Sequence, residues 1–354
     1  MRTALALSIA LASIAVDAQA PLSRPAPVPM PAIDGVIDAL HAHQLVAISD
    51  PHGNQAMRDF LRKLFADARF AEVVDDIVVE IGNARYQALV DSYVNGGNVD
   101  EAVLAEAWLN TTVPNQMAAD LEWFRRARRI NATRPAGRRV RLLLGDPPID
   151  WSKVQTRADH FKWLAMRDSH PAALIQTEIL ARGRKGLIIY GHLHFQRRNV
   201  QSNFVMGAWQ AETIVSLIER AGPTRVFTIW RVEDALTTAF PDAATWKVPA
   251  FATVSGTTLG ALDAGRLMPA PQRFQIVDGK MQAVSKDQFA TLPSEEQLDA
   301  VLYLGPSANT AIAPSAEPCK SPGFLEERLR RIAVTGIPRF EAERIQKLCA
   351  GAPQ

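Results

Sequence analysis

The sequence has few cysteines, no excess of charge and none of several common catalytic signatures. Only two of the 354 residues are Cys, too few for a multi-cysteine zinc site or a disulfide-dense scaffold. Lys and Arg total 39 and Asp and Glu total 37, so the net charge of +2 does not indicate nucleic acid as a partner. The absence of a Gly-x-Ser-x-Gly elbow, a Walker loop and a dinucleotide fingerprint removes the usual indications of a serine hydrolase or a nucleotide-binding protein. The composition, 47% hydrophobic and 21% charged, is that of a globular protein.

The N-terminus has the layout of a secretory signal peptide. A short basic start precedes an unbroken run of apolar and small residues, Ala4–Val16, and small residues then alternate up to Ala20. The run is too short to span a bilayer, which disfavours the alternative of an uncut membrane anchor. We expect a signal peptide over residues 1–18, cleavage after Ala18 or Ala20, and a secreted or periplasmic protein without stable membrane insertion.

Both cysteines lie near the C-terminus, on either side of a helix-like stretch. Cys319 precedes residues 323–347 and Cys349 follows them. Export places both thiols in an oxidising compartment, where disulfides persist. We therefore predict a Cys319–Cys349 disulfide that ties the last segment to the loop before it, with two separate buried thiols as the alternative.

Apolar segments typical of buried strands alternate with helical segments along most of the chain. The predicted strands are residues 44–49, 76–80, 140–144, 186–190, 225–230 and 300–304. The predicted helices are residues 54–70, 85–95, 100–109, 114–128, 158–182 with an interruption near Pro171, and 210–221. This alternation predicts a three-layer α/β fold with a mainly parallel sheet, helices on both faces and a less regular C-terminal extension.

Composition divides the mature chain into three parts. Five prolines between Pro21 and Pro31 predict an extended linker over residues 19–31. Residues 32–310 form the predicted α/β hydrolase-like domain. Within it, residues 231–298 are less regular and are interpreted as an insertion or cap. Residues 311–354 are predicted to form a helical tail.

Side chains that can move protons follow four predicted strands, at the point where each strand ends. In chain order they are Asp50 and His52 after the first strand, Glu80 at the end of the second, Asp146 at the end of the third, and His194 after the fourth. The carboxyl ends of parallel strands form one rim, and ligands bind in the crevice outside it. We therefore expect these side chains to meet at one mouth.

Imidazoles beside carboxylates support two chemistries. A neutral His takes a proton from water while a carboxylate fixes its tautomer, or His and carboxylate groups hold a divalent metal that acidifies water. Structural alternatives are a helix cap for His52 and a turn for Asp146. His192 and His194, two residues apart on an extended segment, would share a direction and suit paired ligands.

The motifs resemble in part those of calcineurin-like metallophosphoesterases. Asp50-Pro51-His52 is similar to the Asp-x-His that opens that family's pattern, and Gly191–His194 to the Gly-His-x-His that closes it. Gly82-Asn83 and Gly145-Asp146 stand in the reverse of that family's order, and Ala84 occupies the place of a His. This resemblance implies a metal-dependent phosphoesterase.

A second resemblance covers more of the chain, from about residue 43 to residue 230, with every motif in order. The sequence resembles the superfamily that joins erythromycin esterase, the haem-uptake protein ChaN, and the Tiki and TraB proteins. The matching places are Ser49–His52, Glu80, Arg167-Asp168 and Gly191–His194; Glu80–Gln87 with Gly145–Trp151 also resembles an uncharacterised exported branch near erythromycin esterase. Ser49-Asp50 replaces the usual Gly-Glu, so whatever this shorter carboxylate contacts must lie closer.

The convergence of four strands motivates the main hypothesis, a hydrolase that activates water at this rim and acts on a small-molecule or peptide substrate. The signal peptide implies that it is exported, and the charge balance does not indicate nucleic acid. His52 would be the general base, oriented by Asp50 or Glu80. His194 would bind the substrate or a metal, and Arg167 would stabilise developing negative charge. The resemblance places four further residues at the substrate: Asp146, Asn83, Arg85 and His192.

The same resemblance leaves the cofactor undetermined. Erythromycin-esterase-like members use His as a base without metal, whereas Tiki members are metal-dependent proteases. A divalent metal would here take His52, Glu80 and His194 as ligands. ChaN binds haem, and a haem- or ligand-binding protein is the alternative function, with His52, His192 and His194 as candidate axial ligands. The metallophosphoesterase is the third alternative.

Overall fold

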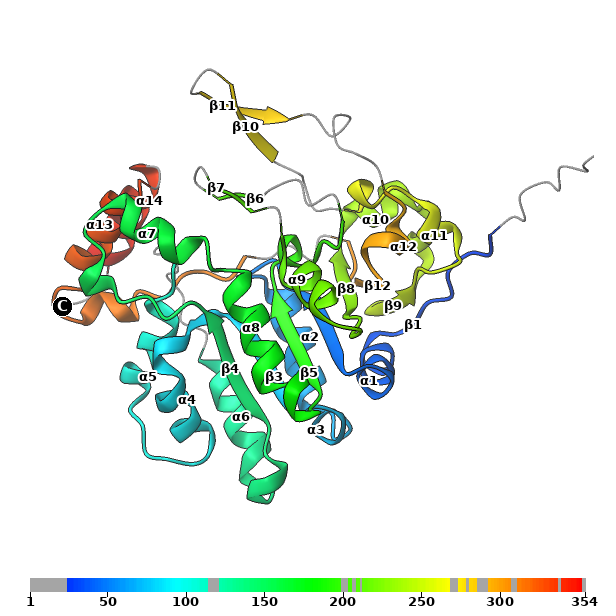
Figure 1. Cartoon of the computed structure of the whole chain (residues 1–354), viewed down its shortest axis with the longest axis horizontal. Coiled ribbons are helices and arrows are strands. Elements are labelled where there is room, and N and C mark those ends of the chain that lie inside the picture. Colours follow the sequence, from blue (N-terminus) through cyan, green and yellow to red (C-terminus); the bar gives the residue numbers. More distant parts are fainter. Residues whose placement is uncertain are drawn as a thin grey trace, which may run out of the picture.

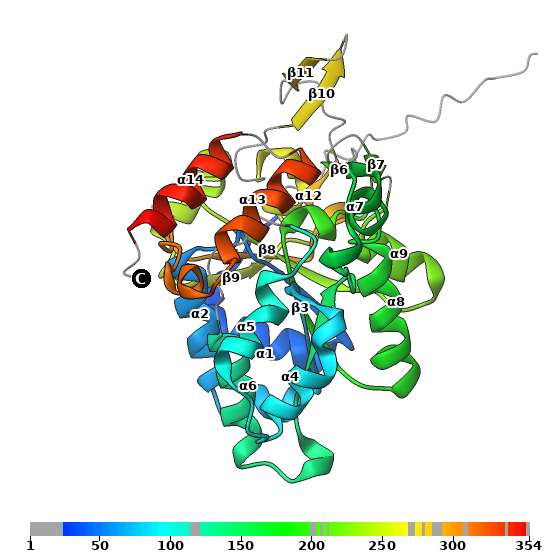
Figure 2. The same cartoon turned by 90° about the vertical axis from the view of Figure 1, so that its left-hand side faces the viewer.

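The computed structural model describes residues 24–113, 121–198, 203–205, 208–210, 212–267, 273–277, 280–284, 292–306, 311–336 and 339–351. The predicted signal peptide, the start of the linker and residues 114–120 of one predicted helix lie outside these ranges. An eight-stranded sheet runs through the middle of the molecule, with helices on both faces (Figures 1 and 2). The predicted three-layer α/β fold is confirmed.

The main sheet has the strand order β1-β9-β12-β8-β2-β5-β3-β4. Its strands are β1 (Met30–Pro31), β2 (Leu45–Ser49), β3 (Asp76–Asn83), β4 (Arg141–Asp146), β5 (Gly186–Tyr190), β8 (Phe227–Val232), β9 (Ala250–Thr253) and β12 (Ala300–Tyr303). All neighbours from β12 to β4 are parallel, whereas β9 is antiparallel to both of its neighbours. Two hairpins form separate sheets: β6 (Asn203–Val205) with β7 (Ala208–Gln210), and β10 (Arg273–Val277) with β11 (Lys280–Val284).

Apolar side chains alternate between the two faces of the central strands. In β2, Val46 and Ile48 belong to one buried core, and Leu45 and Ala47 belong to the other. Every residue of β2 and β5 is buried. Because both faces are covered, these strands are continuous apolar runs in the sequence.

Each face of the sheet has its own set of helices (Figure 2). The first set is α1 (Ala32–Ala42), α2 (Gln55–Ala66), α3 (Phe70–Val73), α4 (Gln87–Val94), α5 (Glu101–Leu109) and α6 (Glu122–Ala132). The second set is α8 (Ser169–Glu178) and α9 (Ile214–Ala221). The remaining helices are α7 (Arg157–Leu164), α10 (Asp234–Ala239), α11 (Thr258–Ala261), α12 (Ser294–Gln297), α13 (Phe324–Thr335) and α14 (Arg339–Ala350).

The helix predicted over residues 158–182 is broken at a different place from the one expected. The break covers residues 165–168, between α7 and α8, and Pro171 lies in the first turn of α8. A proline is tolerated there because the first N–H groups of a helix have no intrahelical partner. The break matters for function because it contains Arg167 and Asp168.

Part of the predicted insertion, residues 231–298, extends the sheet. β9 pairs with β12 through Ala252 and Val301, and with β1 through Phe251 and Met30. The end of the predicted linker is therefore a short strand. Upstream of it, the carbonyl of Pro25 accepts a hydrogen bond from the backbone N–H of Thr258 at 2.9 Å.

The C-terminal tail is a pair of helices, α13 and α14, closed by the predicted Cys319–Cys349 disulfide, which is confirmed. Arg328 of α13 is 1% exposed and donates to the backbone carbonyl of Leu109 at 2.7 Å. This contact fixes α13 beside α5. Within the described ranges, no helix combines the length and the apolar character needed to cross a membrane.

Candidate functional site

Four neighbouring strands bring the predicted residues to one edge of the sheet. In the order β2-β5-β3-β4, His52 follows β2, His194 follows β5, Glu80 lies in β3 and Asp146 ends β4. All four strands are parallel, so this edge is their carboxyl edge. The structure thus places these side chains together, while their chemical roles stay predictions.

Glu80 lies at the centre of this cluster and is 5% exposed. Its Oε2 atom accepts a hydrogen bond from the backbone N–H of Gly191 at 2.7 Å and lies 3.0 Å from His52 Nε2. Its Oε1 atom contacts the Arg167 guanidinium and lies 3.5 Å from His194 Nε2. Burial by itself raises the pKa of Glu80, but the three cations around it outweigh burial and hold that pKa well below its usual value.

His52 is positioned by a left-handed turn after β2. Its φ is 58°, and Gly53 follows with a φ of 59°. The backbone N–H of His52 donates to Asp50 Oδ1 at 3.1 Å, while Asp50 Oδ2 lies 3.7 Å from His52 Nδ1. The cap of α2 is Asn54, which accepts from the Met57 N–H at 3.0 Å, so His52 is not the cap. A left-handed non-glycine residue costs about 1–3 kcal/mol, and such strain concentrates at functional sites.

Asp168 orients His194, and the sequence-based site did not include it. Its Oδ1 atom lies 2.8 Å from His194 Nδ1 and also accepts from the Ile214 N–H at 3.0 Å. Asp168 is 2% exposed. The signal for it in the sequence was the Arg167-Asp168 pair, of which only Arg167 was assigned a role. This carboxylate fixes which nitrogen of His194 faces Glu80.

Asp146 lies behind the cluster and is bound by a loop residue that the sequence analysis missed. Thr112 donates to it twice, from its backbone N–H at 2.7 Å and from Oγ1 at 2.6 Å. Arg167 Nε lies 3.9 Å from Asp146 Oδ1. Burial raises the pKa of Asp146 to about 7, although Arg167 and Thr112 oppose the rise. Asp146 is 3% exposed, so its contacts are with the protein.

The Tyr190 hydroxyl is buried against Gly145, where the charges of Glu80, Asp146 and Arg167 act on it. Tyr190 ends β5, is 1% exposed, and its hydroxyl has no hydrogen-bond partner in the described part of the chain. Burial and the charges of Glu80 and Asp146 raise the pKa of Tyr190 well above its usual value. A Cβ atom at Gly145 would overlap this hydroxyl. Glycine at position 145 is therefore required by the packing of Tyr190.

His192 and His194 do not share a direction, contrary to the prediction. Residues His192–Phe195 form a 3-10 turn and not an extended segment. His194 is buried against Glu80, whereas the ring of His192 lies 6.0 Å from that of Trp230. Residues two apart on a helical turn point to different sides, so the predicted paired ligands are not formed.

Asn83 and Arg85 were predicted to contact the substrate. Both lie at or just after the end of β3, on the side away from the cluster around Glu80. Asn83 is fully buried and donates to the carbonyls of Asn110 at 2.7 Å and Ile149 at 2.9 Å. Its side chain thus holds two loops together and has no surface for a substrate. The Arg85 side chain is 53% exposed and forms an ion pair with Asp150 at 3.3 Å, beside a different pocket.

Both imidazoles of the cluster hold a proton at neutral pH. Burial lowers the pKa of His52, but the charge of Glu80 and the contact with Asp50 outweigh burial and raise that pKa to about 10. For His194, Asp168 and Glu80 likewise outweigh burial and raise the pKa to about 9. The cluster therefore alternates cations and anions.

The contacts of the cluster do not match a metal site. The Nε2 atoms of His52 and His194 both face the carboxylate of Glu80. In the ranges that the structure describes, no three His, Cys, Asp or Glu residues are placed to hold a metal ion together. The predicted ligand set therefore does not fit a divalent metal in this arrangement. The same contacts occupy Nε2 of His52 and of His194, two of the three histidines named as candidate axial ligands of a haem iron.

A cavity of about 80 Å³ borders the cluster at Asp50 and His52. Its apolar wall includes Trp108, Trp123 and Ile81. An apolar wall beside a few polar groups resembles the lining of small-molecule sites, although this cavity is smaller than the roughly 300 Å³ at which such sites begin.

The comparisons with known proteins identify no family for this chain. No family model matches the sequence, and no curated protein matches it. The type III effector HopBA1 is 14% identical with a TM-score of 0.39, over 80% of this chain and 98% of that chain. A Bacillus cereus protein of known structure is 11% identical with a TM-score of 0.43, over 77% and 91% of the two chains. At these values neither similarity identifies a family or a function.

Proposed function

We propose that the chain is an exported hydrolase that cleaves a small-molecule or peptide substrate at the cavity beside Asp50 and His52. The observation that carries the proposal is geometric: His52 lies 3.0 Å from Glu80 at the carboxyl edge of the parallel sheet, beside a cavity that Asp50 and His52 line. The pKa of Glu80 lies well below its usual value, and that of its neighbour His52 is about 10. Groups whose pKa values are pushed apart in this way at a cleft are typical of sites that transfer protons.

In the proposed reaction His52 begins protonated and acts as the general acid, in place of the general-base role that the sequence predicted. Its pKa of about 10 keeps the imidazole charged at neutral pH. Asp50, on the same cavity wall, takes a proton from water, whose oxygen bonds to the substrate's carbonyl carbon. His52 gives its proton to the leaving group as the bond between the carbonyl carbon and the leaving group breaks. Asp50 then returns a proton to His52.

Glu80, His194 and Arg167 act through His52 in this proposal. Glu80 holds the His52 ring at 3.0 Å and keeps it protonated. The sequence predicted that Arg167 stabilises negative charge on the substrate. In this proposal it instead positions Glu80, because its guanidinium is bound to that carboxylate. His194, held by Asp168, fixes Glu80 from the other side.

The test is hydrolysis of a panel of p-nitrophenyl esters and peptide p-nitroanilides by the purified chain. We expect H52Q to lower kcat/KM by about 100-fold or more on any substrate that is cleaved, the usual contribution of acid catalysis. The wild-type kcat/KM should fall as pH rises through about 10, where His52 loses its proton.

The control variant is H41Q, because His41 is exposed at the end of α1, outside the cluster. It should keep wild-type kcat/KM. A chain that cleaves none of these substrates would count against the proposal, and so would an H52Q variant that is as active as the wild type.

A further inference from the structure

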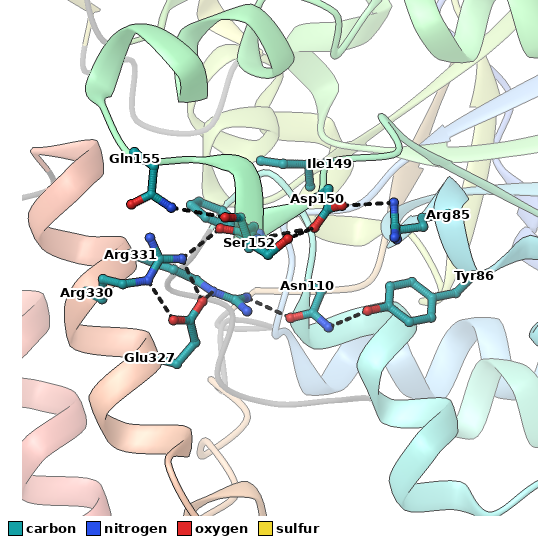
Figure 3. A pocket seen from close by; sticks show the side chains of 11 residues that line it. Arg85, Tyr86, Asn110, Ile149, Asp150, Ser152, Gln155, Glu327, Arg330 and Arg331 are labelled. Atoms are coloured by element: carbon teal, nitrogen blue, oxygen red, sulfur yellow. Dashed lines mark hydrogen bonds and ion pairs between the residues drawn. The ribbon is translucent and has the colours of Figure 1, made fainter.

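A second pocket, of about 380 Å³, lies between the C-terminal tail and the loops that follow β3 and β4 (Figure 3). Arg85 and Tyr86 line one side, and Glu327, Arg330 and Arg331 of α13 line the opposite side. The pocket shares no lining residue with the cavity at Asp50 and His52. Its volume is in the range of small-molecule sites, and the proposed hydrolase reaction does not use it.

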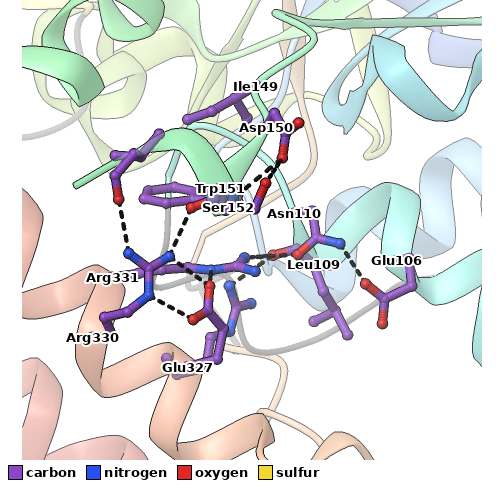
Figure 4. Close-up of polar contacts among 12 residues, drawn as sticks. Glu106, Leu109, Asn110, Ile149, Asp150, Trp151, Ser152, Glu327, Arg330 and Arg331 are labelled. Atoms are coloured by element: carbon purple, nitrogen blue, oxygen red, sulfur yellow. Dashed lines mark hydrogen bonds and ion pairs between the residues drawn. The ribbon is translucent and has the colours of Figure 1, made fainter.

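The α13 side of the pocket is held rigidly by Arg331 (Figure 4). Its Nε atom donates to Glu327 and its Nη1 atom to Asn110 Oδ1, both at 2.7 Å. The guanidinium also lies 4.9 Å from the centre of the Trp151 ring. Arg331 is 8% exposed, so this wall is formed before any ligand arrives.

Arg330 supports the same wall from the next position. It donates to the carbonyls of Trp151 and Val154, each at 2.8 Å, and to Glu327. The hydrogen bonds from Arg330 and Arg331 lower the pKa of Glu327 to about 2, although burial opposes them. The carboxylate oxygens of Glu327 therefore already accept hydrogen bonds from Arg330 and Arg331.

The side of the pocket opposite α13 has hydrogen-bond donors that do not donate to other described residues. The Arg85 guanidinium makes no hydrogen bond to the described residues, and its contact there is the ion pair with Asp150 at 3.3 Å. Asp150 Oδ1 accepts from the N–H and the Oγ of Ser152. The Tyr86 hydroxyl accepts from Asn110 Nδ2 at 2.8 Å, so its own proton is available to a ligand.

We propose that this pocket binds the carboxylate or phosphate group of a small anion, with Arg85 and Tyr86 as its donors. Three arginines line the pocket against two carboxylates, which leaves an excess of positive charge. A guanidinium presents two parallel N–H groups that match the two oxygens of either anion. Arg85 and Tyr86 both line the pocket on the side opposite α13, so a ligand in the pocket can contact both. This inference does not rest on the proposed hydrolase function.

The test is calorimetric titration of the full chain with inorganic phosphate and, separately, with succinate, at constant ionic strength. We expect saturable binding of at least one probe, and a loss of affinity of about tenfold in R85Q and a smaller loss in Y86F. Binding of phosphate alone, of succinate alone or of both identifies which group the pocket accepts. R62Q is the matched control, because Arg62 is 54% exposed and pairs with Asp59 at 3.4 Å.

A second variant gives an effect of opposite sign, which misfolding cannot produce. D150N removes the carboxylate that competes for Arg85 but keeps an oxygen for the Ser152 N–H, so the affinity for the bound probe should rise. Failure of the wild type to bind either probe would overturn the proposal. Equal affinities in the wild type, R85Q and D150N would do the same, whatever the outcome of the hydrolysis assays.

Discussion

Glu80 sets the protonation of the two histidines beside it. Its carboxylate lies 3.0 Å from His52 Nε2 and 3.5 Å from His194 Nε2. E80Q keeps the shape of the side chain but removes its charge, so we expect the pKa of both imidazoles to fall toward the ordinary value of 6.5. Titration of the imidazole signals by NMR measures this change. A His52 pKa that stays near 10 in E80Q would contradict it.

The same protonation makes the stability of the protein depend on pH. The pKa of His52 is about 10 in the folded chain and near 6.5 in the unfolded chain, so the folded state binds the proton more tightly. The resulting stabilisation is complete below pH 6.5 and is lost as pH rises through 10. We expect the free energy of unfolding, measured with urea, to decline more steeply between pH 7 and 10 in the wild type than in H52Q. Parallel pH profiles for the two proteins would argue against this prediction.

The sequence located some site residues and missed others for a physical reason. Asp50, His52 and Glu80 adjoin strongly apolar strands, so the position of each at the rim could be predicted. Thr112 lies in a loop after α5, and its bond to Asp146 depends on long-range packing that no local pattern encodes. The Arg167-Asp168 pair was visible in the sequence. Its contact with His194 was not, because His194 is 26 residues away from Asp168.

At the level of elements, strands were more predictable than breaks in helices. β5 has the predicted bounds, residues 186–190, because a short apolar run between two glycines has few alternatives. β3 is longer than predicted and continues to Asn83, which pairs with Asp146 after a shift of register beyond Val79. Pro171 suggested a break in the helix, yet the same residue also suits a first turn, which is where it occurs. The turn at His192–Phe195 was not predicted, because it contains no Gly or Pro of the kind that usually marks a turn.

The packing between β4 and β5 gives a prediction at this scale. The Tyr190 side chain extends from β5 past β3 to Gly145 of β4. G145A forces the hydroxyl to move, and we expect a loss of about 1–3 kcal/mol in the free energy of unfolding. Y190F removes the oxygen, so the double variant G145A/Y190F should recover part of that loss. Strictly additive effects of the two changes in urea denaturation would contradict the contact.

At the scale of the whole molecule, the disulfide joins the two ends of the tail across 30 residues. Replacing both cysteines by serine frees this loop in the unfolded chain, and we expect a loss of about 3 kcal/mol in stability. Arg328 should keep α13 attached through its bond to Leu109, so the α14 amides should gain more hydrogen exchange than the α13 amides. Equal acceleration in both helices would show that α13 depends on the disulfide alone.

The second wall of the larger pocket comes from α13, whereas the cluster around Glu80 is complete once the chain has reached α9. Evolution can therefore alter these two features independently. Relatives that keep Ile312, which lines the cavity at His52, but end before α13 should inherit the proton-handling residues without any preference for anions. Relatives that keep the tail but have exchanged Glu80 should show the reverse pattern.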